Sequence, residues 1–513
     1  MKKNINLHKL LNSVGILTPS EFINSEIKNI SFNSKDVEKG TLFLGRAGTK
    51  VDGGIYWQDA INNGAEAAII SKEVAKHYDK INYHRVLVLD QPLDYIFGQI
   101  ISEFWNRPSR ELKLIGVTGT NGKTTITFLL EYLLEELGQS VALFGTLYNR
   151  WPGFSEESHH TTDFADKLQP KLNHARNANV DFGIMEVSSH ALAQKRISGC
   201  EFIAAIFTNL SQDHLDYHFN MQSYFKSKMQ LFKFPYLLSK DSFSVINIDN
   251  VWGLKLLKNI DSSSFIISTN KNEKFLGNKN YFYVTKKELT KSGTSCLFHT
   301  PSQEIELFIP LVGEFNLMNA LQAITVLYKL GFPLKSISKC IKSFPGVSGR
   351  MERLIIKEQD FKNHLPVVII DYAHTPDGLE KVLESLRNFA ERKIITVFGC
   401  GGERDSNKRS KMGSIAEKLS DFIFITSDNP RKENPKKIIA DILSGIKNKD
   451  KIIIDIDRYC AIEKAINFAE NNDIVLIAGK GHENYQILKN KTIDFDDKKV
   501  ALHFLIERLK ISK

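Results

Sequence analysis

The sequence predicts an α/β protein of about three domains, of which the second and third are built on parallel sheets. The chain has 513 residues, and single domains commonly span about 100 to 200 residues. Continuous apolar runs such as "SVALFGT" and "FIAAIFTNL" alternate with longer segments of helical periodicity, which is typical of parallel strands covered by helices on both faces. Nearly every run ends in Gly, Asp, Asn, His or Arg, at the place where open α/β sheets bind ligands.

Two connecting stretches divide the chain into the predicted domains. Short apolar runs, "GTLFLG" and "HRVLVLD", indicate a small α/β domain over residues 1–108, which ends at "WNRPSRELKL". The central domain, over 109–345, begins with the strand "KLIGVTG". The segment "SFPGVSGRMER" is rich in residues that favour turns, and the strand series that follows it forms the third domain over 346–513.

Composition narrows the class of protein. The formal net charge is +9, but the lysines are scattered and no long basic run appears. This favours a solvated surface, with an anionic partner as the alternative. The five cysteines form no C-x-x-C pair, the start is a poor signal peptide, and no run of about 18 apolar residues occurs. We expect a cytoplasmic monomer that takes small-molecule substrates and binds neither nucleic acid nor membrane.

Residues 114–138, "LIGVTGTNGKTTITFLLEYLLEELG", carry the most informative local pattern. A strand, a glycine-containing loop and an amphipathic helix that ends near Gly138 follow one another, which is the context of a phosphate-binding loop. In the common pattern G-x-x-x-x-G-K-[ST], Val117 takes the position of the first glycine. This argues against the common GTPase and transporter ATPase families, and an ordinary glycine turn is the alternative. We predict that Lys123 meets the β- and γ-phosphates and that the Thr124 hydroxyl faces Mg²⁺.

The segment "GTNGKTT" resembles the loop of the Mur ligase superfamily, ATP-dependent enzymes that form amide bonds and include folylpolyglutamate synthetase. The resemblance implies that ATP is bound by Gly119, Thr120, Asn121, Gly122, Lys123, Thr124 and Thr125. The segments "LVGEFNLMNALQA", "GRMER" and "DYAHTPD" also resemble family segments, and they imply nucleotide contacts from Asn316, Arg350, Asp371 and His374. Because these residues come from two domains, domain closure would be part of catalysis.

The same resemblance implies a magnesium centre. Glu186 ends the strand in "DFGIMEVSSH", and a carboxylate there can hold Mg²⁺ directly or through water. The segment "TNLSQDHLDYH" is similar to the family motif whose histidine, here His214, lies beside a second metal. The segment "HFNMQSYFKSKMQ" resembles the pattern whose lysine, here Lys228, takes up CO₂ as a carbamate. The implied metal-binding residues are Thr124, Glu186, His214 and Lys228, and the implied catalytic residues are Lys123, Lys228 and His214.

Three segments resemble those that bind a UDP-muramoyl-peptide acceptor in the family. The first domain is similar to a uridine-binding domain, although the usual D-S-R is here Asn33, Ser34 and Lys35. The segment "HHTTDFADKLQ" is similar to the family's T-T-P segment, with Asp163 in place of the proline. The acceptor contacts implied here and in "EVSSHALAQKR" are Ser34, Thr161, Thr162, Ser188, Gln194 and Arg196. The first domain argues against folylpolyglutamate synthetase.

The third domain resembles family members that add meso-diaminopimelate. This amino acid carries a distal carboxylate, which a guanidinium holds with two parallel hydrogen bonds. The implied contacts lie in "CGGERDSNKR", "SDNPRKENP" and "AGKGHENYQ", and they are Arg404, Asp428, Asn429, Pro430, Arg431, Gly479 and Glu483. Glu483 would hold the distal ammonium. For Asp428 to Arg431 alone, an Asp-Asn-Pro turn is the alternative.

The resemblance implies a central P-loop ATPase domain between a uridine-binding α/β domain and a C-terminal Rossmann-like domain. The implied activity uses ATP and Mg²⁺ to join meso-diaminopimelate to the γ-carboxylate of UDP-N-acetylmuramoyl-L-alanyl-D-glutamate through an acyl phosphate, in peptidoglycan precursor synthesis. One alternative is a sister ligase that adds L-lysine, against which Arg431 argues because the guanidinium would remain unpaired. The other alternative is a P-loop ATPase that serves as a regulatory or binding module.

Overall fold

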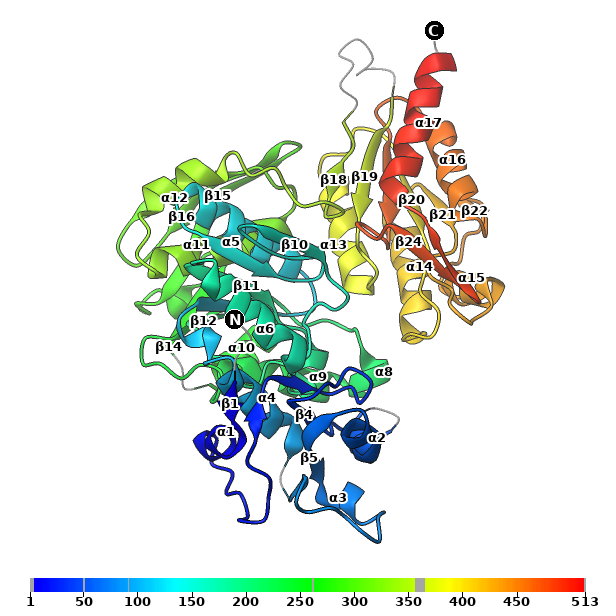
Figure 1. Cartoon of the computed structure of the whole chain (residues 1–513). Coiled ribbons are helices and arrows are strands. Elements are labelled where there is room, and N and C mark those ends of the chain that lie inside the picture. The colour runs from blue at the N-terminus through cyan, green and yellow to red at the C-terminus, as the bar shows by residue number, and fades with distance from the viewer. Residues whose placement is uncertain (1–3, 49–50, 91, 261–262, 356–364, 512–513) are drawn as a thin grey trace.

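Four-stranded, eleven-stranded and six-stranded sheets follow one another along the chain, in the order of the three predicted domains. The structure is a computed structural model and describes residues 4–48, 51–90, 92–260, 263–355 and 365–511. In Figure 1 the N-terminal domain lies at the bottom, the central domain above it and the C-terminal domain at the upper right. The predicted α/β class with three domains is confirmed.

The N-terminal sheet is parallel and has the order β3-β4-β5-β6. Alternate side chains of its strands fill two cores, one against α1 and α4 and the other against α2 and α3. A short antiparallel pair, β1 and β2, precedes it. The elements are β1 (Ile5–Asn6), α1 (Leu7–Ser13), β2 (Glu26–Ile27), β3 (Asn29–Ser31), β4 (Thr41–Leu44), α2 (Trp57–Asn62), β5 (Ala65–Ser71), α3 (Lys72–Ala75), β6 (Val86–Leu89) and α4 (Leu93–Phe104).

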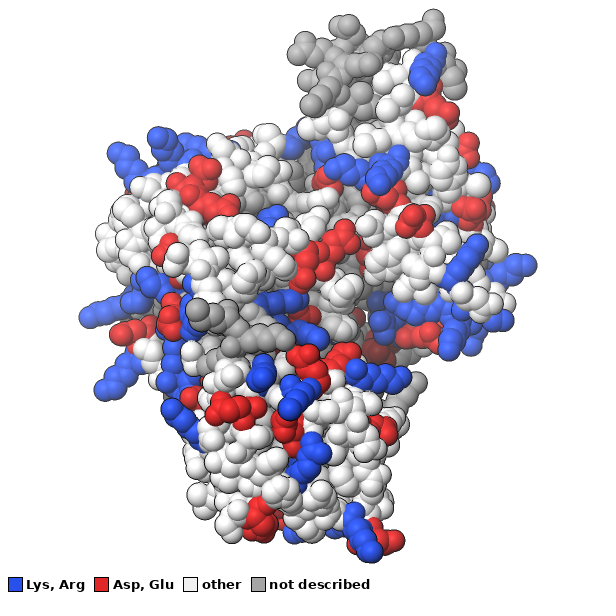
Figure 2. Space-filling view, in the orientation of Figure 1, with Lys and Arg blue, Asp and Glu red and all other residues white. Residues whose placement is uncertain are grey.

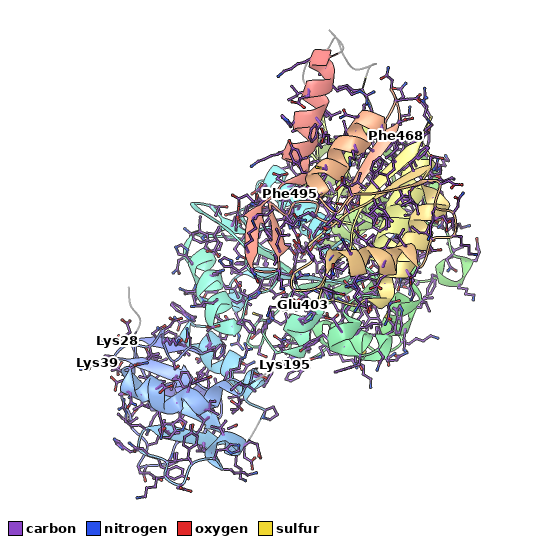
Figure 3. All side chains as sticks on the ribbon, turned by 90° about the vertical axis from the view of Figure 1, so that its right-hand side faces the viewer. Lys28, Lys39, Lys195, Glu403, Phe468 and Phe495 are labelled. Carbon is purple, nitrogen blue, oxygen red and sulfur yellow. The ribbon has the colours of Figure 1, made fainter. Side chains whose placement is uncertain are left out.

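Helix α4 also joins the first domain to the second. A Cβ atom on Gly98 would lie 2.2 Å from the Cβ of Ser198, so the glycine allows the helix to approach the central domain closely. The Ser102 hydroxyl donates to the Gly199 carbonyl at 2.8 Å. Figure 3 shows the N-terminal domain, with Lys28 and Lys39 at its far edge, projecting from the other two.

The central sheet has the order β10-β9-β8-β11-β7-β12-β13-β14-β15-β16-β17. The seven neighbouring strands β8, β11, β7, β12, β13, β14 and β15 are parallel, as the apolar runs predicted. One face packs on α5, α11 and α12, and the other on α6, α7, α9 and α10. The strands are β7 (Lys113–Thr118), β8 (Val141–Phe144), β9 (Tyr148–Trp151), β10 (Phe154–Glu157), β11 (Phe182–Glu186), β12 (Ala204–Phe207), β13 (Phe243–Asn247), β14 (Ser263–Ser268), β15 (Tyr281–Thr290), β16 (Gly293–His299) and β17 (Glu304–Ile309). The helices are α5 (Lys123–Glu136), α6 (Ala165–Asn177), α7 (Ser189–Ala193), α8 (Leu215–His218), α9 (Met221–Met229), α10 (Val251–Leu257), α11 (Glu314–Lys329) and α12 (Leu334–Ile341).

Both edges of this sheet are antiparallel, which the sequence did not predict. Strands β9 and β10 extend one edge, and β16 and β17 extend the other. Along β10, β15 and β17 many side chains are exposed or only half-buried. Edge strands of this kind carry polar residues on their open face and therefore lack the continuous apolar run that identified the inner strands.

The C-terminal sheet has the order β18-β19-β23-β20-β21-β22 and is parallel except at β18. Helices α13, α14 and α15 cover one face, and α16 and α17 cover the other. The strands are β18 (Glu352–Arg353), β19 (Val367–Asp371), β20 (Ile394–Phe398), β21 (Phe422–Ile425), β22 (Ile452–Ile454) and β23 (Ile474–Ala478). A separate antiparallel pair is formed by β24 (Tyr485–Leu488) and β25 (Lys491–Asp494). The helices are α13 (Pro376–Arg387), α14 (Asn407–Leu419), α15 (Pro435–Leu443), α16 (Arg458–Phe468) and α17 (Asp497–Ile511).

The predicted domain boundaries at residues 108 and 345 lie between these sheets and stay predictions. Charged side chains of both signs are spread over the visible face, and Lys and Arg do not gather in one field (Figure 2). Among the described helices, none combines the length and apolar character needed to cross a bilayer.

Candidate functional site

The loop between β7 and α5 needs its glycines for close packing. A Cβ atom on Gly119, where φ is +154°, would lie 1.8 Å from the Thr208 hydroxyl oxygen. On Gly122, where φ is +88°, it would lie 2.3 Å from the side-chain oxygen of Asn319. Val117 is fully buried inside β7, so the position of the first glycine in the common pattern is not part of this loop. The altered spacing thus leaves the phosphate-facing part of the loop intact.

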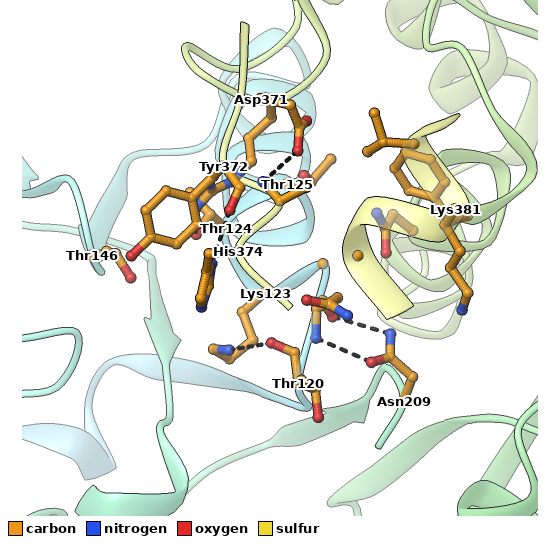
Figure 4. Close-up of a pocket in the computed structure, with 18 of the residues that line it drawn as sticks. Thr120, Lys123, Thr124, Thr125, Thr146, Asn209, Asp371, Tyr372, His374 and Lys381 are labelled. Atoms are coloured by element: carbon orange, nitrogen blue, oxygen red, sulfur yellow. Dashed lines mark hydrogen bonds between the residues drawn. The ribbon is translucent and has the colours of Figure 1, made fainter. Parts of the chain in front are cut away.

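Two lysines predicted from separate motifs meet at one carbonyl oxygen of this loop. The amine of Lys123 donates to the Gly119 carbonyl at 3.0 Å, and the amine of Lys228 donates to the same oxygen at 2.7 Å. Lys228 is 1% exposed. Burial, and then the charge of Lys123, hold the pKa of Lys228 well below its ordinary value, which favours the uncharged amine. Figure 4 shows Lys123 turned toward the backbone of Thr120, to which it donates at 2.9 Å.

Glu186, at the end of β11, lies against the start of α5. Its carboxylate accepts from the hydroxyls of Thr124 and Thr146, both at 3.0 Å, and from the Thr146 backbone N–H at 2.9 Å. Its side chain is fully buried. Among the described residues no group of three or more His, Cys, Asp or Glu is arranged to hold a metal ion. Mg²⁺ in nucleotide sites takes one or two protein oxygens and completes its shell with phosphate and water, and Thr124 with Glu186 fits that requirement.

His214 follows the loop after β12 and has a left-handed backbone with φ +55°. Its Nε2 atom lies 3.3 Å from a carboxylate oxygen of Asp213. The ring of His190 lies 4.8 Å from the His214 ring. Burial lowers the pKa of His214 to about 3, so the imidazole stays neutral, which is the form that can bind a metal.

His218 is a structural histidine. Its two ring nitrogens face the hydroxyls of Ser189 and Ser227, at 2.9 and 3.5 Å, and its ring stacks on Tyr224. Since the side chain is 4% exposed, it connects the start of α7 to α9, the helix that carries Lys228.

The C-terminal domain closes the site through Arg350 and His374. Arg350 donates to the Thr124 hydroxyl at 3.4 Å, and its guanidinium lies 4.1 Å from the centre of the Tyr372 ring. Its Nη1 atom is buried and has no partner among the described residues. His374 lies 3.8 Å from the Asp213 carboxylate. These contacts across the domain boundary leave one guanidinium nitrogen free for an anion.

Asp371 has a supporting position. One carboxylate oxygen accepts the Met351 N–H and the other accepts the Ala373 N–H, both at 2.7 Å. Asp371 therefore fixes the two backbone segments that carry Arg350 and His374. Its contact with the nucleotide stays a prediction, and the residue lines the cavity.

The cavity between the two domains has a volume of about 220 Å³. The predicted loop residues Thr120 to Thr125 line it, together with Glu186, His214, Asn316, Arg350 and His374. A second cavity of about 320 Å³ shares Asn209, Phe315, Asn319 and Lys381 with it. The two form one groove, whose first part lies at the phosphate-binding loop.

The predicted acceptor residues of the central domain form one cluster next to Glu186. The Thr162 hydroxyl donates to the Glu186 carbonyl at 2.8 Å and accepts the Ser188 N–H at 3.1 Å. Arg196 donates to the Thr162 carbonyl at 2.9 Å and to the side-chain oxygen of Gln194 at 2.9 and 3.0 Å. The Thr161 hydroxyl accepts from Thr146 at 3.1 Å. The structure thus places these acceptor residues beside the proposed magnesium site.

Asp163 explains how the loop is held without the family proline. Its carboxylate accepts from the Lys171 amine at 2.6 Å, and Lys171 also pairs with Glu156 on β10. The ion pair between Asp163 and Lys171 thus fixes the loop at the position where the family segment has a proline ring. Ser34 is different, since its carbonyl accepts from Asn63 at 3.0 Å and no hydrogen bond joins it to the other acceptor residues among those described.

Arg46 was missed by the sequence analysis. It follows β4, and its guanidinium lies 3.9 Å from the centre of the Phe164 ring. The Arg196 guanidinium lies over the same ring, also at 3.9 Å. Burial, and then the charge of Arg46, lower the pKa of Arg196 to about 10. Two cations from two domains meet on this ring and form a candidate site for an anion. Asp94 lies 3.9 Å from Arg46, and the charges of Asp166 and Asp163 also act on Arg46 and Arg196 respectively. Its signal was the "GRAG" cluster at a strand end.

The predicted amine pocket lies where β20, β21 and β23 end. The Asn429 amide donates to a Glu483 carboxylate oxygen at 2.8 Å. Arg431 donates to the Gly402 carbonyl at 2.8 Å, and its other guanidinium nitrogens have no partner among the described residues. A Cβ atom on Gly479 would lie 2.8 Å from the Asp428 carboxylate. Except for the exposed Arg404, the predicted residues are therefore packed together.

Two further cations in this pocket were not predicted. Lys480, fully buried, donates to Glu483 at 3.0 Å and to Asn429 at 3.1 Å. Arg409, 1% exposed, donates to the Gly401 carbonyl at 3.1 Å and pairs with Glu433. Both side chains hold the loops that carry the predicted residues. In the sequence, the only signal for Lys480 was its place between two glycines in "GKG".

Comparison with known proteins agrees with this geometry. Three family models match: "Mur ligase family, catalytic domain" over residues 26–107, "Mur ligase middle domain" over 117–327 and "Mur ligase, glutamate ligase domain" over 349–481. A protein of Prochlorococcus marinus subsp. pastoris named UDP-N-acetylmuramoyl-L-alanyl-D-glutamate--2,6-diaminopimelate ligase is 61% identical, and the match covers 99% of both chains. A protein of the same name from Thermosynechococcus vestitus is 43% identical over 99% of both chains.

Solved structures show the same fold. A structure titled as a UDP-N-acetylmuramoyl-L-alanyl-D-glutamate--2,6-diaminopimelate ligase matches with a TM-score of 0.68 and 29% identity, covering 99% of this chain and 100% of the other. A MurF ligase from Thermotoga maritima, in complex with ADP, matches with a TM-score of 0.61 and 16% identity, covering 94% of this chain and 98% of that one.

Replacing His218 with Gln is expected to make the folded protein less sensitive to acid. Burial lowers the pKa of His218 to about 4 from its ordinary 6.5. Between these values the unfolded chain binds a proton that the folded protein does not, so stability falls as the pH falls through this window. The histidine accounts for at most about 3 kcal/mol of that loss.

The measurement is the urea-unfolding midpoint at about pH 5 and about pH 7.5. The matched control is His503→Gln, because the His503 side chain is 52% exposed. A parent and an H218Q variant with the same pH dependence would contradict the prediction.

Proposed function

The chain belongs to the Mur ligase family, and we propose that it joins meso-diaminopimelate to the D-glutamyl γ-carboxylate of UDP-N-acetylmuramoyl-L-alanyl-D-glutamate, at the expense of ATP. The observation that carries the substrate choice is the presence of the Arg431 guanidinium and the Glu483 carboxylate in one pocket, where each is hydrogen-bonded to Asn429. An amino acid with a distal carboxylate and a distal ammonium complements both charges. The relatives that cover the whole chain are named for the same amine.

The nucleotide half of the reaction begins at the phosphate-binding loop. ATP transfers its γ-phosphoryl group to the acceptor carboxylate, which gives an acyl phosphate and ADP. Lys123 and Arg350 line the cavity and balance the charge that develops on the phosphoryl oxygens. Magnesium, when bound, neutralises phosphate charge, and Thr124, Glu186 and His214 would hold it.

We propose that Lys228 carries a carbamate. Its amine lies in a dry position and no carboxylate pairs with it among the described residues. An uncharged amine reacts with CO₂ by forming an N–C bond and releasing a proton, which converts a buried base into an anion. That anion faces Lys123, whose positive charge otherwise opposes a charged Lys228. The carbamate would thereby add an oxygen donor beside the magnesium ligands.

The acceptor is proposed to lie along the junction of the first two domains. Arg46 and Arg196, stacked on Phe164, suit its anionic groups. Thr162 and Ser188 border Glu186 and so place the γ-carboxylate next to the phosphoryl group. Ser34 is kept as a proposed contact with the uridine end.

The amine half of the reaction takes place between the central and C-terminal domains. Arg431, Asn429 and Glu483 hold the distal end of the amino acid, so that its reacting amine points toward the acyl phosphate. The uncharged amine attacks the carbonyl carbon and a tetrahedral intermediate forms. Phosphate then leaves with the bonding electrons of the acyl C–O bond, and the proton lost by the nitrogen ends on the released phosphate. The chain contributes positioning and electrostatic stabilisation and no covalent nucleophile. Such a ligase would work in the cytoplasm on small molecules, as a monomer.

Phosphate release is expected to require three substrates together: ATP, the UDP-muramoyl dipeptide and meso-diaminopimelate. The measurement is phosphate release with meso-diaminopimelate or L-lysine, with the product mass read by mass spectrometry. Turnover with lysine in place of diaminopimelate would refute the substrate choice and keep the ligase. Phosphate release that is indifferent to acceptor and amine would refute the ligase itself and favour an ATPase module.

Replacing Arg431 with Lys should raise the KM for meso-diaminopimelate by about 10- to 100-fold. The lysine keeps the charge but cannot form two parallel hydrogen bonds to a carboxylate. Steady-state kinetics with the amino acid varied measure the change. The neighbouring exposed Lys432→Ala is the control, and an unchanged KM in R431K would show that Arg431 does not hold the substrate.

Replacing Lys228 with Ala should reduce kcat by at least about 100-fold, because the anion beside the magnesium ligands is lost. Lys226→Ala, which removes an exposed lysine from the same helix, should leave kcat within about twofold of the parent. Bicarbonate with an isotopically labelled carbon should give a carbamate NMR signal in the parent and in K226A, and none in K228A. Full activity in K228A would refute the role.

A further inference from the structure

Gln212 spans the boundary between the central and C-terminal domains. Its side-chain N–H donates to a carboxylate oxygen of Asp405 at 3.1 Å, and its side-chain oxygen accepts from the Lys411 amine. Both polar ends of one central-domain amide therefore contact the other domain. Gln212 does not line the cavity, so these two bonds do not serve direct contact with a ligand there.

On the central side, the segment that carries Gln212 is bonded to the phosphate-binding loop. The Thr120 N–H donates to the Asn209 carbonyl, and the Asn121 N–H donates to the Asn209 side-chain oxygen, both at 3.0 Å. The Ser211 N–H donates to the Thr120 hydroxyl at 3.1 Å. Figure 4 shows Asn209 beside the loop, with dashed hydrogen bonds between them. Residues 209–214 and the loop thus form one unit, which a nucleotide on the loop would fix in place.

On the other side, Asp405 belongs to the loop that borders the amine pocket. It is 7% exposed, and its second carboxylate oxygen accepts the Asn407 N–H at 2.9 Å at the start of α14. The same loop carries Arg404, and the Gly402 carbonyl accepts from the Arg431 guanidinium. The position of Asp405 therefore sets the position of the backbone on which Arg431 rests.

We propose that Gln212 is a positioning residue that couples nucleotide binding to amino-acid binding. A nucleotide orders the phosphate-binding loop and residues 209–214, and the Gln212 amide transmits that order to residues 400–406. The amine pocket is then complete only when the nucleotide site is filled. As a result, the pocket is already ordered when the acyl phosphate forms. The inference rests on the proposed function, since it takes meso-diaminopimelate as the ligand of this pocket.

The test measures the dissociation constant of meso-diaminopimelate by calorimetry on the full chain, with and without a non-hydrolysable ATP analogue and Mg²⁺. In the parent the analogue is expected to tighten amino-acid binding by about tenfold. In Gln212→Ala this ratio should fall below about twofold, while the affinity for the analogue alone is unchanged, because the Asn209 and Ser211 bonds remain. In turnover, the KM for diaminopimelate should rise with kcat retained.

Two further variants complete the test. Lys411→Met removes the bond to the Gln212 oxygen from the opposite domain and should also lower the ratio. Gln222→Ala, an exposed glutamine that bonds Lys255 on the surface, should leave the ratio at the parent value. A parental ratio in Q212A, or a parent without coupling, overturns the inference. A parent that makes no product from diaminopimelate overturns the proposed function as well, whereas normal product with unaltered coupling overturns only the role of Gln212.

Discussion

The carbonyl oxygen of Gly119 accepts hydrogen bonds from two lysine side chains, and most of the site's chemistry depends on that shared contact. Two charged amines that bond one oxygen lie within about 6 Å and repel by about 3 kcal/mol at an effective dielectric of about 20. Burial, and then this repulsion, lower the pKa of Lys228, whereas the pKa of Lys123 is lowered by burial first. Only anions relieve it fully, and both proposed partners, a nucleotide phosphate and a carbamate, are anions. Without such an anion, burial and repulsion favour the uncharged form of Lys228.

Parallel strand ends explain why three ligands can meet at this point. The loops after β7, β11 and β12 carry the phosphate-binding residues, Glu186 and His214, and they open at the same edge of the central sheet. The C-terminal domain lies beside the central domain (Figure 1), and Arg350, Arg431 and Glu483 lie in segments next to its strands. Since Arg350 bonds Thr124 and Asn121 bonds Asp377, the two edges face one another across the cavity. Each sheet thus supplies half of a reaction that neither completes alone.

Local patterns made the loop and the inner strands predictable. Gly119 to Thr125 are contiguous in the sequence. The inner strands of both large sheets are buried on both faces, so each appears as a continuous apolar run. Both features can therefore be recognised from a short stretch of sequence. Arg46, Gln212 and Lys480 had no such pattern, because their partners lie in another domain or on another strand. Asp371 has a supporting part that its motif did not indicate, since each of its carboxylate oxygens accepts a backbone N–H. Sequence thus identifies ligand chemistry better than it identifies the residues that hold the ligand-binding loops.

Five residues next to predicted ligand contacts have a left-handed backbone, which their side chains disfavour. Lys195, His214, Met351, Glu403 and Arg431 all have left-handed backbones, with φ between +51° and +55°, a region that residues other than glycine seldom adopt. Each lies beside a predicted ligand contact, in loops from both domains. Glycine would remove the backbone cost, of about 1 kcal/mol or more at each position, but it would also remove the imidazole of His214 and the guanidinium of Arg431. These turns are held by tertiary bonds, such as the Arg431 N–H to the Ile487 carbonyl. Because the strain is held from outside each loop, the position of these side chains depends on the bonds that the loops make to neighbouring segments, including those across the domain boundary.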